Sequence, residues 1–92
     1  MKYFLDTNII IWFMEKNPLL PERIRDVILD DKNEILISIV LLWEITIKWS
    51  LGKLELSVDL DEFLNDIDSK DYFQIISIKN EYLLYFIRGE VL

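Results

Sequence analysis

The chain has 92 residues, of which 52% are hydrophobic, enough for the core of one globular domain, so a disordered chain is excluded. The 17 acidic and 10 basic residues give a formal net charge of −7, which excludes binding of nucleic acid by long-range attraction without a cation or a local basic patch. The lack of cysteine and histidine excludes disulfides, thiolate metal sites and histidine catalysis, so carboxylate, hydroxyl, amide and lysine groups remain.

The first half of the chain is predicted to form strand, helix, helix, strand and helix. Their ranges are 2–5, 9–15, 21–30, 35–38 and 40–51. Pro21 suits the first position of the second helix, and Gly52 suits the position just after the third. The apolar residues of the second helix recur with the spacing of one helical face.

The second half is predicted to add a helix, a strand and a last helix. Asp59 and Glu62 have capping-box spacing and predict a helix that begins there, with an apolar stripe at i, i+3, i+4 and i+7. Residues 72–78 read as a third buried strand, and Asn80 as the cap of a helix over residues 81–87. Because there is no repeat or linker, residues 1–92 are predicted to be one α/β domain with parallel strands.

The start of the chain lacks the basic segment and cleavage site of a signal peptide, and no apolar run approaches the roughly 20 residues of a membrane span. We therefore expect a soluble, cytoplasmic protein without membrane contact, which agrees with the missing cysteines.

Asp6 is the first candidate for chemistry because it follows the first strand, where open α/β sheets place their ligands. The alternative is that Asp6, Thr7 and Asn8 only cap the following helix, and the tripeptide alone favours neither interpretation.

Glu44 is the second candidate because its helix is apolar nearly all round, which predicts a buried carboxylate that needs a partner. One partner is Lys48, one turn later, in a contact worth about 0.3–0.5 kcal/mol when exposed. The other is a cation shared with Asp6, which we favour because an incompletely paired buried carboxylate is costly.

Ser38 closes the second strand, where it either caps the next helix or binds a metal-bound water. Lys48 and Lys53 could contact a phosphate, although solvation is the more common fate of such lysines. Two carboxylates with water and an amide or hydroxyl suit Mg²⁺ or Mn²⁺. Such an ion would polarise a phosphodiester and activate a water without histidine.

Several segments in register resemble the PIN-domain proteins of the VapC toxin type. They are residues 1–10, Ser38, residues 42–48, residues 51–56 and residues 73–78. The resemblance implies a three-layer α/β/α fold with a short parallel sheet. It also implies a Mg²⁺- or Mn²⁺-dependent endoribonuclease, the toxin of a toxin-antitoxin pair, usually a homodimer and inhibited by a cognate antitoxin. Carried over by position, Asp6 and Glu44 are catalytic and metal-binding acids, and Asn8, Ser38 and Thr7 are polar supports.

The family pattern continues past the equivalent of Ile87 into a segment with a third acid, and then into strands four and five. That segment is absent here, so we expect a domain truncated relative to the family, with three strands, weak metal binding and impaired catalysis. The family's strand order, 3-2-1-4-5, would leave residues 2–5 as an exposed edge that a dimer, an exchanged element or another partner covers.

Two further functions remain open. One is a truncated, catalytically impaired PIN module that acts as a protein-binding or dimerisation partner. The other is a phosphatase with Asp6 as nucleophile, which the sequence supports less because Asn8 stands where a second Asp is expected.

Overall fold

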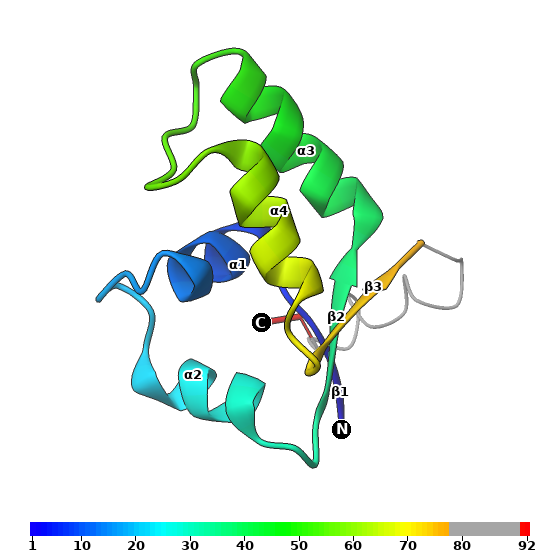
Figure 1. Cartoon of the computed structure of the whole chain (residues 1–92). Coiled ribbons are helices and arrows are strands. Elements are labelled where there is room, and N and C mark those ends of the chain that lie inside the picture. Colours follow the sequence, from blue (N-terminus) through cyan, green and yellow to red (C-terminus); the bar gives the residue numbers. More distant parts are fainter. Residues whose placement is uncertain (78–90) are drawn as a thin grey trace.

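The computed structural model describes residues 1–77 and 91–92 (Figure 1). These residues form strands and helices in the predicted order. The elements are β1 Lys2–Phe4, α1 Thr7–Met14, α2 Glu22–Leu29, β2 Glu34–Ser38, α3 Ile39–Ser50, α4 Leu60–Asp68 and β3 Phe73–Ile76. The last predicted helix, over residues 81–87, lies outside the described residues.

The three described strands form one parallel sheet in the order β1-β2-β3. Tyr3 lies opposite Ile35, and Ile35 lies opposite Phe73, so β2 is paired on both sides. Figure 1 shows α1, α2 and α4 on the same side of this sheet. The predicted α/β fold with a short parallel sheet is confirmed, and the strand order agrees with the 3-2-1 part of the expected order.

The core lies between the sheet and the helices, and each described helix contributes one isoleucine with no exposed surface. These residues are Ile10, Ile28, Ile45 and Ile67. Burying an isoleucine side chain stabilises a fold by roughly 1.5–3 kcal/mol, so these contacts explain why short helices persist here. Within the described part of the chain, no helix is both long and apolar enough to cross a bilayer.

The helix ends show which local sequence signals act in the structure. Gly52 follows α3 with φ 71°, as predicted for a residue that ends a helix in the left-handed region. Pro21 is the N-cap of α2, so the helix begins one residue after the start that was predicted for it. The predicted capping box of α4 is wrong, because the side chain of Asp59 makes no cap hydrogen bond, while Asp61 Oδ1 accepts from the backbone N–H of Glu62.

The predicted burial of α3 is also wrong for about half of its surface. Ile45 and Leu42 face the core, but Trp43 is 64% exposed and Ile47 is 42% exposed. The helix therefore presents an apolar outer face, which we call the α3 outer face. Its exposed residues are Ile39, Val40, Trp43, Ile47 and Leu51.

The edge of β1 that was predicted to be open is partly covered by the same chain. Val91 forms an isolated parallel bridge with Phe4. The backbone N–H of Leu92 donates to Phe4 O over 2.8 Å, and the backbone N–H of Asp6 donates to Leu92 O over 2.7 Å. Residues 91–92 thus occupy the position where the expected covering chain was to lie.

Candidate functional site

The structure brings Asp6 and Ser38 to the same end of adjacent strands. Phe4 lies opposite Leu36, and the N–H of Leu5 donates to Leu36 O over 3.1 Å, so the pairing continues past β1. Asp6 follows two residues after the end of β1, and Ser38 is the last residue of the adjacent parallel strand β2. Both residues then begin a helix, which places polar groups at the carboxyl edge of the sheet.

Three hydrogen bonds, two from the backbone and one from the side chain of Asp6, hold this residue in position. Its Oδ1 accepts from the backbone N–H of Thr7 over 2.8 Å, and its carbonyl accepts from the N–H of Ile10. Its own N–H is bonded to Leu92 O. The predicted N-cap role is confirmed, yet the exposed carboxylate keeps a second oxygen with no hydrogen-bond partner among the described residues. That oxygen is available to a cation or a water.

Ser38 is buried, with 1% of its surface exposed, and caps α3. Its Oγ accepts from the backbone N–H of Val40 over 3.1 Å. The capping interpretation is therefore confirmed. The hydroxyl hydrogen remains able to donate, so the suggested contact with a metal-bound water stays a prediction.

Glu44 is half exposed and paired with Lys48. Glu44 Oε1 lies 2.8 Å from Lys48 Nζ, and the two side chains are 44% and 49% exposed, respectively. The argument that Glu44 must share a cation because it is buried is thus wrong. An exposed pair of this kind contributes only about 0.3–0.5 kcal/mol, so a competing cation could separate Glu44 from Lys48.

The other predicted site residues lie close to Asp6 in sequence and at the surface. Asn8 is exposed in the first turn of α1, and Thr7 is the first residue of that helix. The described residues contain no group of three or more acids that could hold a metal ion. The structure thus places Asp6 and Ser38 at the same edge of the sheet, whereas the roles of Asp6, Ser38 and Glu44 at a metal site stay predictions.

Two features near the other end of α1 had no signal in the sequence pattern. The carboxylate of Glu15 accepts from both the N–H and the Oγ of Ser57, a contact that ties the end of α1 to the loop before α4. Lys16, next in the chain, has φ 54°, in the left-handed region that side chains rarely adopt. The hydrophobic periodicity of a sequence does not indicate tertiary contacts or backbone strain of this kind.

Comparison with protein families matches residues 3–87 to the PIN domain. Neither the curated proteins nor the solved structures contain a match to the chain. The matched span includes Asp6, Ser38 and Glu44, and PIN domains are generally nucleases that typically depend on a divalent metal ion. A match over this much of the chain, together with the parallel sheet, shows that the protein belongs to the PIN domain family.

Proposed function

We propose that this protein is a Mg²⁺- or Mn²⁺-dependent endoribonuclease and the toxin component of a toxin-antitoxin pair. The observation that carries the proposal is the placement of Asp6 and Ser38 at the carboxyl ends of adjacent parallel strands, within the span that matches the PIN domain. An RNA substrate and a cognate antitoxin are the partners that this proposal implies.

The donor groups fit a hard divalent cation. Asp6 offers a free carboxylate oxygen, Glu44 offers a second carboxylate on release from Lys48, and Asn8 can contribute an amide nearby. When bound, the ion would neutralise phosphate charge and lower the pKa of an attacking water. Because only two acids are proposed and one is already paired, we expect weak metal binding.

Each protein group has a separate task in this proposal. The N-cap bond fixes the carboxylate of Asp6 toward solvent, and the buried Ser38 hydroxyl can orient a water at the neighbouring strand end. Lys48, once separated from Glu44, can contact a phosphate of the RNA. The cation and Lys48 together offset the repulsion between RNA and a chain of net charge −7.

The test is cleavage of single-stranded RNA with added Mn²⁺ or Mg²⁺ by the full chain and by two variants. Asp6→Asn keeps a side-chain oxygen for the cap but removes the charge, so it should lower the cleavage rate at least about a hundredfold without unfolding the protein. Glu44→Gln should also lower it.

Asp30→Asn is the matched control, because Asp30 Oδ1 likewise accepts a backbone bond, from Lys32 N–H, but lies before β2. Asp30→Asn should cleave as the unaltered chain does. Equal cleavage by the unaltered chain and Asp6→Asn would refute the nuclease proposal. The toxin role requires, in addition, that expression halts growth of the host cell and that Asp6→Asn abolishes the arrest.

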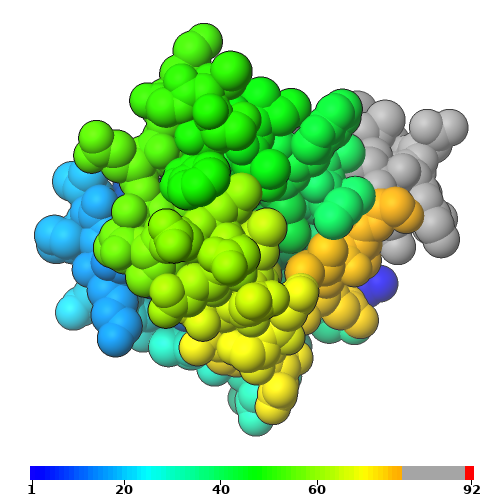
Figure 2. Space-filling model, turned by 45° about the horizontal axis from the view of Figure 1, so that its top comes forward, coloured from blue at the N-terminus to red at the C-terminus, as the bar shows by residue number. Residues whose placement is uncertain are grey.

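A second candidate function, a protein-binding or dimerisation module, is favoured by the α3 outer face. Next to this face lies a groove of 560 Å³ between α3, α4 and β3, elements that Figure 2 shows side by side. Trp43 and Ile75 line it and are exposed. Exposed apolar surface of this extent is typical of protein contacts.

Light scattering on the unaltered chain and on Trp43→Glu separates the two functions. A dimer that Trp43→Glu converts to a monomer, together with no RNA cleavage, would support the binding module alone. A monomer in both samples at high concentration would contradict self-association.

A further inference from the structure

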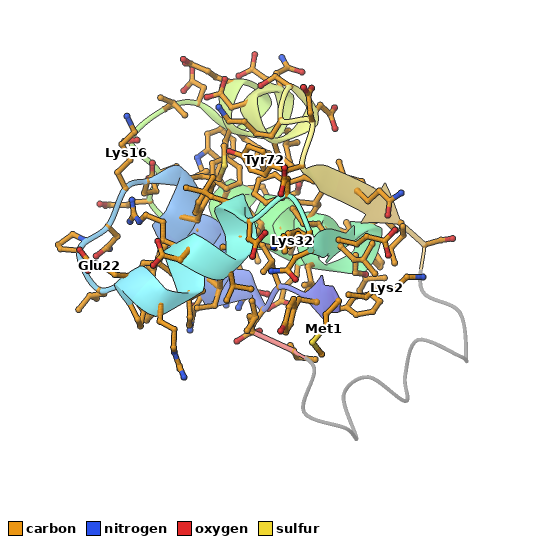
Figure 3. The ribbon with its side chains drawn as sticks, turned by 90° about the horizontal axis from the view of Figure 1, so that it is seen from below. Met1, Lys2, Lys16, Glu22, Lys32 and Tyr72 are labelled. Carbon is orange, nitrogen blue, oxygen red and sulfur yellow. The ribbon has the colours of Figure 1, made fainter. Side chains whose placement is uncertain are left out.

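A pocket of 380 Å³ lies at the opposite end of the sheet from Asp6 and Ser38. Its walls come from the end of α1, from α2, from the end of α4 and from Tyr72, which directly precedes β3. Figure 3, seen from below, shows Lys16 and Tyr72 on this side of the molecule. The volume lies in the range of about 300–1,000 Å³ that is usual for small-molecule sites.

Basic side chains gather around this pocket in an otherwise acidic chain. Lys16, Arg25 and Lys70 line it, with Asp66 as its one acidic lining residue. In the part of the chain that the structure describes, none of these three cations forms an ion pair, whereas Lys2 and Lys48 do. Three such cations, one from α2 and one each from the loops after α1 and α4, favour an anionic ligand.

The pocket also has an aromatic and apolar side. Phe13 and Tyr72 meet edge to face, with ring centroids 6.1 Å apart, and Met14 and Leu29 complete the apolar lining. The Tyr72 phenol is neutral at physiological pH and can donate a hydrogen bond, and burial raises its pKa further. A bare inorganic anion would leave the apolar lining unused.

The backbone at Lys16 is an independent observation. Lys16 follows the C-cap of α1 with φ 54°, where glycine or asparagine is the usual residue because a side chain is strained there. A strained non-glycine residue whose charged side chain lines a pocket is the pattern expected where function has retained a side chain at a cost in stability.

We propose that this pocket binds a nucleoside phosphate, with Lys16, Arg25 and Lys70 around the phosphate and the base against Phe13 and Tyr72. Base–aromatic contact combined with cationic groups is the general mode of sequence-tolerant nucleotide binding. The ligand is either a free nucleotide or one nucleotide of a single-stranded RNA. The site is separate from the Asp6 edge and does not depend on the nuclease proposal.

The test is calorimetric titration of the full chain with AMP, adenosine, inorganic phosphate, the dinucleotide ApA and hexa-adenylate, all in EDTA. EDTA prevents metal-dependent cleavage, so failure here is distinguishable from failure of the nuclease proposal. We expect AMP to bind more tightly than adenosine and phosphate. Tighter binding of AMP than of ApA identifies a free nucleotide, whereas affinity that rises from ApA to hexa-adenylate identifies an RNA strand.

The variants Arg25→Gln and Lys16→Gly should each weaken binding about two- to fivefold, the effect of one exposed charge contact. Lys32→Gln is the matched control, because it removes the same charge from the same side of the molecule but does not line the pocket. Equal losses in all three variants, or equal affinity for phosphate and AMP, would overturn the proposal. Binding of adenosine as tightly as AMP would overturn it too.

Discussion

Removal of the Ser38 hydroxyl tests how α3 is attached to the sheet. Ser38→Ala deletes the one side-chain bond to the first turn of α3, the 3.1 Å contact with Val40 N–H. Loss of an N-cap costs about 0.5–2 kcal/mol. The bond is only partly buried, so water can reach the freed N–H of Val40, and the expected loss is near the middle of that range, about 1 kcal/mol.

For a domain of this size, a loss of about 1 kcal/mol lowers Tm by roughly 4–8 °C. Urea unfolding followed by circular dichroism gives the free energy directly. Ser50→Ala is the control, because Ser50 Oγ donates to Ile47 O on the exposed end of the same helix, where a change of at most about 0.5 kcal/mol is expected.

A loss for Ser38→Ala no larger than that for Ser50→Ala would refute the capping argument. Cleavage assays at a temperature where both variants are folded then separate the two roles of Ser38. If Ser38 only caps α3, Ser38→Ala leaves the rate of RNA cleavage unchanged. If its hydroxyl also orients a water, Ser38→Ala lowers that rate.

Three further outcomes follow from individual contacts. Lys48→Gln frees Glu44 from its 2.8 Å pair and should tighten Mn²⁺ binding about two- to fivefold in a titration followed by electron paramagnetic resonance; weaker binding would contradict competition for Glu44. Lys16→Gly relieves the φ of 54° and should raise the free energy of unfolding by about 0.5–1 kcal/mol in urea; a decrease would show that the strain argument fails. Because burial raises the pKa of folded Tyr72 above 10.0, the unfolded chain loses the phenol proton at a lower pH than the folded chain does. The contribution of the neutral phenol to the free energy of unfolding is therefore fully present below pH 10 and is lost as the pH rises through the pKa of the folded state. Tyr72→Phe should reduce the fall in the free energy of unfolding between about pH 8 and about pH 11. A pH profile of stability that is the same in the variant and the unaltered chain would contradict this role of Tyr72.

The sequence predicted the order of elements because the apolar periods and helix-ending residues act locally. Gly52 ends α3 where expected, and Asp6 and Ser38 cap helices, which is one of the two roles that the sequence left open for each. Asp6 follows the first strand and Ser38 closes the second, so the carboxyl-edge placement followed from the predicted parallel sheet alone.

The surroundings of Glu44 could not be predicted because hydrophobicity does not say which element covers a helix face. An all-round apolar helix such as α3 was expected to be buried, yet Trp43 is 64% exposed. The predicted capping bond of Asp59 was wrong for a different reason. Its spacing to Glu62 satisfied a capping pattern, but Asp61, two residues further along, bonds the Glu62 N–H instead.

The bond from Asp6 N–H to Leu92 O links the candidate site to the order in which the protein folds. The pairing of Phe4 with Val91 joins segments from opposite ends of the described chain, so its closure entropy is larger than that of the β1–β2 pairing. Among the described residues, a single bridge supports this pairing, and we expect it to form last and to open first in native-state hydrogen exchange. The backbone at Asp6 therefore reaches its final geometry only when residues 91–92 dock, while the rest of the sheet is already in place.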